Sequence, residues 1–425
     1  MTRIVVKTLY IVIGMLLILS CASCSDDPYY YPEIVTPEDE SMDELLKFSY
    51  KHINDPPLKY QNNTNAYIGF YEDNLYIKSK SVFYRINPLS GYKTTVCPDP
   101  ICSHETETCP VYSIASAFCV HEGVFYFDKL TMAETETKES ISAFDLSSSK
   151  ISTVYNRTQC SKQYIRMMIY EDYLYFYKSY YVGEDDNKKI ISDIAGVNLK
   201  TGDVIDVIKY DTSVFDHLIG GDGGYLFLCN PTGGIFRIKA GESLPSKEYL
   251  YSFDKSDLLN YAPDRMALKN GYIYYYTSSN DSTDFWRIPT SGGEPQNFVS
   301  DNGIKADYCF YTQNYIYYSA ITQKKIGVID GEDLMCDIYD IRRVSYENGS
   351  CEEVFRDFPE EYDTYSLSGG YIVSGNYIYT HTWDWGELKD RYTDSDCRYD
   401  SGYSGVIARI DIETGEIRYI GSNLK

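Results

Sequence analysis

Apolar and aromatic positions alternate with polar ones in a phrase that recurs seven times along the chain. Each copy is a polar or glycine-containing turn followed by a strand of alternating aliphatic and aromatic residues. Such alternation predicts a half-buried β-strand, and the turn residues predict a hairpin in front of it. The copies are EDNLYIKS (72–79), HEGVFYFD (121–128), YEDYLYFY (170–177), GDGGYLFL (221–228), KNGYIYYY (269–276), TQNYIYYS (312–319) and SGNYIYTH (374–381).

A second phrase follows each copy of the first. In four repeats it holds an Arg before Ile or Val and a Gly six residues after that Arg, and a short strand then closes the unit; these are Arg85, Arg287, Arg343 and Arg409. Four antiparallel strands per repeat of this length are the signature of a β-propeller blade. We therefore predict an all-β fold, a single β-propeller of seven four-stranded antiparallel blades over residues 62–425. Separate β-sandwiches would not explain the fixed order of the phrases.

The pairing of a tyrosine-rich strand with the phrase R-I-x-x-x-x-G resembles two kinds of repeat protein. One is the YWTD-type propeller of receptor ectodomains, and the other is the TolB-type propeller of bacterial envelopes. The chain looks most like uncharacterised bacterial extracytoplasmic lipoproteins that carry such YWTD-like or TolB-like domains. The resemblance covers roughly residues 62–425, and it implies a fold rather than a ligand.

The start of the chain has the form of a signal peptide. Residues 1–8 carry Arg3 and Lys7 and no acid, an uncharged run of 11 residues follows, and SCASC comes next. The run is shorter than the roughly 20 residues that a membrane-spanning helix needs. Small residues before a cysteine resemble a bacterial lipobox, so we predict a lipoprotein signal over 1–20 and lipid on Cys21, with Cys24 as the alternative. An ordinary secretory signal with incidental cysteines is the other interpretation.

The next segment, residues 21–61, is acidic and interrupted by prolines, which predicts a solvated tether. The whole chain has a formal net charge of −23. A field of that sign repels phosphate backbones and argues against nucleic-acid binding. The predicted location is the bacterial cell envelope, outside the cytoplasm and anchored to the membrane by lipid.

Uneven connections between the second and third strands of the repeats predict the interaction face. Residues 178–192, 319–337 and 381–404 are interpreted as long loops, and length variation on one face marks a candidate binding surface. The last loop holds two of the three tryptophans beside a carboxylate, a combination that could stack on a sugar or anchor a peptide. The candidate ligand-binding residues are His381, Trp383, Asp384, Trp385 and Tyr392. Packing of the two tryptophans on a neighbouring blade is an equal alternative.

The stretch CPDPICSHETETCP joins the first repeat to the second. Its spacing places Cys97, Cys102, His104 and Cys109 within 13 positions (97–109). Three thiolates and an imidazole can complete a tetrahedral zinc shell, and closed shells of this kind are structural. A disulfide between two of these cysteines, or between one of them and Cys119 or Cys160, is equally compatible with an extracytoplasmic chain. One structural zinc is thus the only cofactor indicated, with a disulfide or free thiols as the alternatives.

Catalytic motifs do not emerge from the sequence. It contains no G-x-S-x-G elbow, no H-E-x-x-H and no phosphate-binding loop. We expect a membrane-anchored binding or scaffold lipoprotein that recognises a glycan, peptide or protein on the loop face. A propeller-fold glycan hydrolase or lyase, with catalytic residues unknown, and a purely structural envelope protein are the alternatives.

Overall fold

A computed structural model describes residues 68–420 of the chain. Within that range it leaves out 72–73, 80–81, 88–92, 100–101, 103–108, 112–117, 133–136, 158–166, 183–188, 211–215, 231–232, 254–265, 280–281, 330–331, 356–364, 375 and 385–402. The predicted signal peptide, the tether and both candidate lipidation cysteines, Cys21 and Cys24, lie outside the described residues. No helix among the described residues is long and apolar enough to cross a membrane.

The described strands form seven four-stranded antiparallel sheets, each built from four strands that are consecutive in sequence. The first four sheets are β1 (Ile68–Tyr71), β2 (Asn74–Ser79), β3 (Val82–Ile86), β4 (Lys93–Thr95); β5 (Phe118–His121), β6 (Val124–Met132), β7 (Thr137–Asp145), β8 (Lys150–Arg157); β9 (Met167–Tyr170), β10 (Tyr173–Val182), β11 (Lys189–Asn198), β12 (Val204–Ile208); and β13 (His217–Asp222), β14 (Tyr225–Asn230), β15 (Gly234–Lys239), β16 (Glu248–Tyr251). The last three are β17 (Ala267–Lys269), β18 (Tyr272–Ser278), β19 (Ser282–Pro289), β20 (Gln296–Asn302); β21 (Ala306–Tyr311), β22 (Tyr315–Ile329), β23 (Glu332–Ser345), β24 (Cys351–Phe355); and β25 (Tyr365–Ser374), β26 (Tyr377–Asp384), β27 (Tyr403–Asp411), β28 (Ile417–Ile420).

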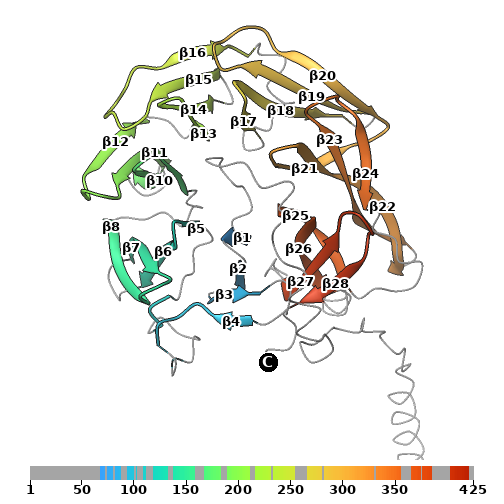
Figure 1. The fold of residues 1–425 in the computed structure, drawn as a ribbon, viewed down its shortest axis with the longest axis horizontal. Coiled ribbons are helices and arrows are strands. Elements are labelled where there is room, and N and C mark those ends of the chain that lie inside the picture. The colour runs from blue at the N-terminus through green and yellow to red at the C-terminus, as the bar shows by residue number, and fades with distance from the viewer. Residues whose placement is uncertain are drawn as a thin grey trace, which may run out of the picture.

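The sheets follow one another around a ring, with β1–β4 beside β25–β28 (Figure 1). The first strand of each sheet is innermost, and β1 contacts both β5 and β25. The all-β prediction and the prediction of a β-propeller with four-stranded antiparallel blades are confirmed. We number the sheets blades 1 to 7 in chain order.

The turns between the first and second strands of a blade explain the glycines of the repeated phrase. In blades 2 and 5 both turn residues have positive φ, Glu122 (47°) with Gly123 (77°) and Asn270 (49°) with Gly271 (76°). Two successive left-handed residues make the tight turn whose twist matches that of the flanking strands. The local sequence therefore fixes the hairpin register of these strands.

The turns between the third and fourth strands share another device. Asp145, Asn198 and Asp411 each accept hydrogen bonds of 2.8–3.0 Å from the backbone N–H groups two and three residues ahead. Such side-chain turns need a left-handed residue to close them, and Gly202 (φ 78°) and Gly415 (φ 72°) supply it. This is why a Gly follows the Arg of the second phrase at a fixed distance.

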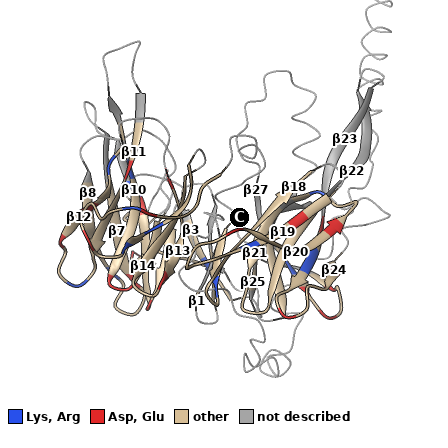
Figure 2. Cartoon of the chain, turned by 90° about the horizontal axis from the view of Figure 1, so that it is seen from above, with Lys and Arg blue, Asp and Glu red and all other residues tan. Residues whose placement is uncertain are grey.

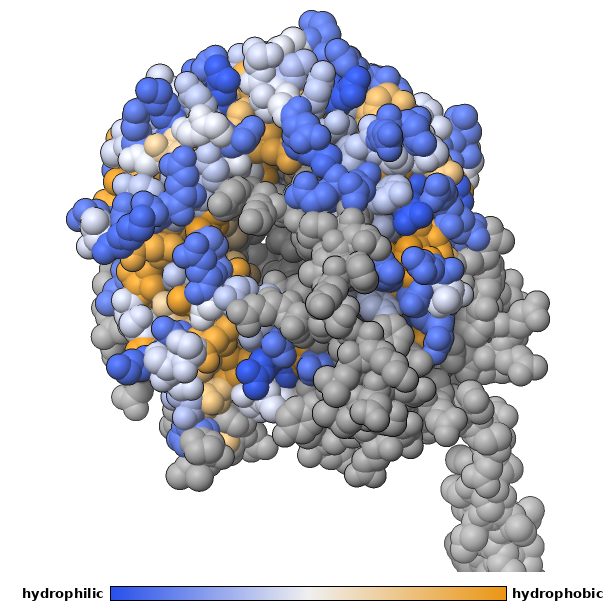
Figure 3. All heavy atoms as spheres, in the orientation of Figure 1, coloured by the Kyte–Doolittle hydropathy of each residue, from blue (hydrophilic) through white to orange (hydrophobic). Residues whose placement is uncertain are grey.

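The core lies between blades rather than within one sheet. Buried residues form clusters at the blade junctions; Met168 and Tyr175 of blade 3, for example, pack with Leu228 and Phe236 of blade 4. Figure 3 shows hydrophobic residues set among hydrophilic ones around one face of the ring. Each blade therefore buries its faces mainly against its neighbours, as expected of a repeat ring.

Apolar packing joins the first blade to the last among the described strands. Leu75 and Ile86 of blade 1 belong to the same buried cluster as Ile378 and Ile410 of blade 7. Because every sheet uses consecutive strands, no sheet combines strands from the two ends of the chain. The apolar contacts of this cluster therefore hold the closure.

The long connections predicted as loops are largely extended hairpins, and that prediction is corrected. Strands β10 and β11 pair out to Val182 and Lys189, and β22 and β23 pair out to Ile329 and Glu332. These arms continue the second and third strands of blades 3 and 6, so they leave the ring on the same side; Figure 2 shows the ring edge-on. Backbone pairing satisfies the polar groups of such a segment without a local hydrophobic core.

Candidate metal centre

The cysteine-rich connection between β4 and β5 begins as a continuation of blade 1. Val96 donates a backbone hydrogen bond to the Phe83 carbonyl at 2.8 Å, so the chain stays beside β3 for one residue beyond β4. Cys97 then donates to the Thr95 carbonyl at 3.1 Å, and Cys102 donates to the Asp99 carbonyl at 3.3 Å. These short-range bonds turn the chain back on itself and bring Cys102 beside Cys97.

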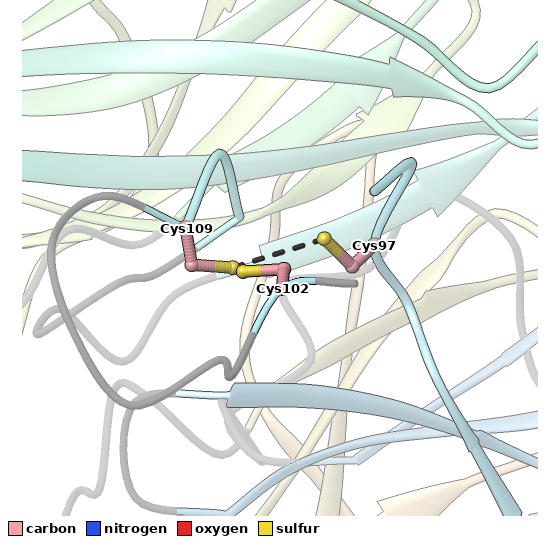
Figure 4. Close-up of side chains that lie close together, drawn as sticks. All are labelled: Cys97, Cys102 and Cys109. Atoms are coloured by element: carbon pink, nitrogen blue, oxygen red, sulfur yellow. Dashed lines mark hydrogen bonds between the residues drawn. The ribbon is translucent and has the colours of Figure 1, made fainter. Parts of the chain in front are cut away.

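Three cysteine side chains converge at this turn. The Sγ atoms of Cys97, Cys102 and Cys109 all lie within 4.8 Å of one another, and the Cys97 and Cys109 sulfurs are 3.9 Å apart. Figure 4 shows the three sulfurs directed toward one another from different parts of the connection. No disulfide joins any two of these three cysteines in the structure. It is the only group of three or more potential metal-binding side chains among the described residues.

The cluster is embedded in the junction between blades 1 and 2. Cys109 is buried with Phe83, Phe125 and Phe127, and Cys97 and Cys102 pack against the same aromatic cluster. The Nζ atom of Lys129 in β6 donates to the Pro110 carbonyl at 3.2 Å, which fixes the end of the connection to blade 2. The cysteines thus lie where a disulfide or a bound metal ion would hold the two blades together.

The electrostatics of the cluster are dominated by burial. Burial, with a smaller contribution from the nearby Cys102 and Cys97 sulfurs, raises the pKa of Cys109 to about 12. Burial likewise raises the pKa of Cys97 above its ordinary value. Backbone hydrogen bonds from Val111 to Cys109 and from Asp99 to Cys97 oppose these shifts. Without a cation the two thiols stay protonated at neutral pH, whereas a bound divalent ion would reverse that preference.

The other predicted members of this site differ in their outcome. His104 lies outside the described residues, so its role stays a prediction. Cys119 in β5, proposed from sequence as a disulfide partner, is a free thiol outside the three-sulfur group. Burial raises its pKa to about 12. The structure therefore brings together three of the four predicted ligands and leaves Cys119 apart.

Three of the five predicted ligand-binding residues of blade 7 lie on a strand rather than in a loop. His381, Trp383 and Asp384 belong to β26, where Trp383 pairs with Ser366 of β25 and Tyr403 of β27. The prediction of a loop starting at residue 381 is therefore wrong, because backbone pairing continues to Asp384. Trp385 and Tyr392 lie outside the described residues.

A buried polar network between blades 3 and 4 is a feature that the sequence pattern did not reveal. Asp216 is fully buried, and its carboxylate accepts hydrogen bonds from Lys247 Nζ at 2.7 Å and Asn230 Nδ2 at 2.5 Å. Tyr177 donates its hydroxyl proton to the Asp216 carbonyl at 3.0 Å. Because the charge is paired and hydrogen-bonded, this network locks two blades together rather than presenting a reactive group. No sequence spacing links these residues, which are 14 to 39 positions apart from Asp216.

The sequence matches no protein-family model and no curated protein. Among solved structures it is similar to an uncharacterized protein from Listeria monocytogenes EGD-e, with 12% identity over 86% of this chain and 97% of that chain and a TM-score of 0.48. It is also similar to an oligogalacturonate lyase in complex with manganese (10% identity, 76% and 86% covered, TM-score 0.44) and to Porphyromonas gingivalis dipeptidyl peptidase 4 (8% identity, 91% and 62% covered, TM-score 0.44). The chain thus spans less than two thirds of that peptidase. No activity is transferred from likenesses this distant.

Proposed function

We propose that the chain is a bacterial extracytoplasmic lipoprotein, anchored by lipid on Cys21, whose β-propeller binds a glycan, peptide or protein on one face. The anchor is inferred from the signal-like start of the sequence and the cysteine that follows it. The acidic tether would let the ring stand away from the membrane. The binding face is inferred from the arrangement of the connections.

The observation that carries the proposal is the asymmetry between the two faces of the ring. The turn between the first and second strands spans only 122–123 in blade 2 and 223–224 in blade 4. On the other face, the connection between the second and third strands grows into the β10–β11 and β22–β23 arms. Segments that the ring itself does not need are typical of binding surfaces.

Blade 7 contributes recognition chemistry to the same face. His381, Trp383 and Asp384 occupy the end of β26 from which the second-to-third connection leaves. Trp385 and Tyr392 follow in sequence. Aromatic rings beside a carboxylate are suited to stacking on a sugar ring or to anchoring a peptide. The formal net charge of −23 disfavours nucleic acid as the partner.

The proposal is tested by screening the full chain, held in detergent, against glycans, cell-wall fragments and peptides. The matched variant replaces residues 323–337 by Asn-Gly. This change joins Thr322 to Ile338, which are cross-strand partners, through a two-residue turn. The control is Lys200→Ala, an exposed residue in the turn between β11 and β12 on the opposite face.

Saturable binding that Lys200→Ala retains and the trimmed variant loses supports recognition on the arm-bearing face. Equal binding by both variants would place recognition elsewhere. Consumption of a glycan with release of product would instead establish the alternative, a propeller-fold hydrolase or lyase. No ligand in any library, together with an envelope defect when the chain is deleted, would favour a structural role.

A further inference from the structure

The cysteine cluster between blades 1 and 2 has the dimensions of a metal-thiolate site. In a tetrahedral zinc site with Zn–S bonds of about 2.3 Å, two sulfurs lie about 3.8 Å apart. The Cys97 and Cys109 sulfurs are 3.9 Å apart, and Cys102 completes a triangle with no side longer than 4.8 Å. From these distances we propose that Cys97, Cys102 and Cys109 bind one structural Zn²⁺ ion.

A disulfide explains the same arrangement less well. A disulfide bond is about 2.05 Å long and uses two sulfurs. The Cys97 and Cys109 sulfurs are 3.9 Å apart, which is far longer, and a disulfide between any two of the cysteines would use only two of the three converging sulfurs. A single ion accounts for all three sulfurs at once.

Two of the cysteines are held by nearby backbone. Cys97 is hydrogen-bonded by the backbone of Asp99, and Cys109 by the backbone of Val111, each two residues ahead. Hydrogen bonds of this kind orient metal ligands.

The chemistry of the ligands selects the class of metal. Thiolates favour zinc, copper(I) and iron–sulfur centres, whereas calcium and magnesium require oxygen ligands. A four-iron cluster needs four cysteines, and the described group holds three. Zinc takes four ligands in a closed structural site. The sequence offers His104, between Cys102 and Cys109, as the fourth.

The ion would link blades 1 and 2. Cys97 follows blade 1, and Cys109 packs against Phe125 and Phe127 of blade 2. A bond through one ion would fix the intervening connection against both blades. With His104 as the fourth ligand the zinc shell would be closed, and closed shells of this kind are structural.

The test uses the full chain, purified with a thiol reductant and without chelators, then dialysed against ZnCl₂ and freed of excess metal. We expect about one zinc per chain by elemental analysis and X-ray absorption with sulfur neighbours at about 2.3 Å. Cys102→Ala should lose the zinc. Cys119→Ala should retain it, because Cys119 in β5 lies outside the group and packs between blades 2 and 3. His104→Ala should weaken retention, and His104→Cys should restore it.

A second measurement uses the wild-type chain and therefore does not depend on the folding of any variant. Chelation should make the three cysteines reactive to an alkylating reagent, as mapped by mass spectrometry, and added zinc should protect them again. Metal-free protein with a mapped bond between any two of these cysteines would overturn the proposal. So would zinc bound without sulfur neighbours, equal zinc content in Cys102→Ala, or copper or iron taken up in place of zinc from an equimolar mixture.

Discussion

Blades 4 to 7 and the junction of blades 1 and 2 are stabilised by different means. In each of blades 4 to 7 the Arg of the second phrase lies over the ring of the Tyr that opens the second strand, at 4.2–4.9 Å from its centroid. The pairs are Arg237–Tyr225, Arg287–Tyr272, Arg343–Tyr315 and Arg409–Tyr377. A local pair repeated in each of these four blades thus ties the second strand to the third.

The first three blades lack that pair because one or both partners are replaced. Gly196 stands at the arginine position of blade 3, and in blade 2 Ala143 stands at the arginine position and Val124 at the position of the stacked Tyr. Blade 1 keeps Arg85 but has Asn74 where the stacked Tyr would be. The cysteine cluster occurs in this part of the ring. The repeated Arg–Tyr pair therefore joins the strands in blades 4 to 7. The cysteine cluster, which does not repeat, occurs at the junction of blades 1 and 2, where that pair is missing.

Two of the stacked arginines also form ion pairs with the fourth strand of their blade. Arg237 and Arg343 form ion pairs with Glu248 and Glu352 of the fourth strand, at 2.6 and 2.8 Å. Each Arg thus connects the second, third and fourth strands of its blade. Glu248 is largely exposed, so the ion pair itself contributes little and the stacked, partly buried guanidinium contributes most.

Removal of a whole blade should have the largest effect. Deletion of residues 215–264, which contain blade 4, exposes the faces of blades 3 and 5 and breaks their shared clusters. We expect an insoluble or molten chain, because closure of the ring removes exposed edges. Calorimetry and near-ultraviolet circular dichroism check this. Cooperative melting with a native-like signal would mean that the blades are independent.

Two equivalent leucines compare the closure with an internal junction. Leu75 in blade 1 packs in the closing cluster, and Leu226 in blade 4 packs between blades 3 and 4; both are fully buried. We expect Leu75→Ala and Leu226→Ala each to lower the free energy of unfolding by about 2–5 kcal/mol. Urea denaturation measures it. A much smaller loss for Leu75→Ala would show that the closure opens before the ring unfolds.

The arginines test the repeat motif. We expect Arg287→Gln to lower the free energy of unfolding by about 0.5–2 kcal/mol, since it removes a cation–π contact with Tyr272. Arg85→Gln should change it by less than about 0.5 kcal/mol, because Arg85 is exposed and has Asn74 in place of the stacked Tyr. Thermal denaturation of the two variants and of the wild-type chain measures these changes. Equal losses would remove stacking as the reason for the motif.

Metal removal should act locally. Chelation of the zinc-loaded chain should make residues 97–110 more sensitive to protease while the ring still melts in one transition, because the blade cores remain. Limited proteolysis with mass mapping, with Cys119→Ala as the control, measures the change. Loss of the whole cooperative transition on chelation would show that the ion is needed for the fold itself.

Lipidation should leave the ring unaltered. We expect the mature N-terminus to be Cys21 carrying acyl chains, as measured by mass spectrometry of the intact protein. Cys21→Ala should release the chain from membranes without changing its melting temperature. An unmodified mature terminus beyond Cys24 would contradict the anchor.

Much of the fold could be predicted from local signals. The left-handed turn residues Gly123 and Gly271 and the alternation of the following strands identified the hairpins, because both depend on a few neighbouring residues. The polar segment 319–337 was interpreted as a loop, yet most of it lies in β22 and β23. Backbone pairing along a two-stranded arm requires no apolar alternation, so the pattern could not distinguish the two.

The sequence by itself determined the blade, since turn chemistry, alternation and the fixed spacing from Arg409 to Gly415 are encoded within each repeat. It also indicated that Cys97, Cys102 and Cys109 were candidate ligands, but spacing left metal and disulfide equally open. Only the tertiary structure brought three sulfurs together and left Cys119 apart. It likewise created the buried Asp216–Lys247 pair. The reason is physical: a turn depends on the conformations of adjacent residues, whereas a site depends on how separate segments are positioned by the packing of blades.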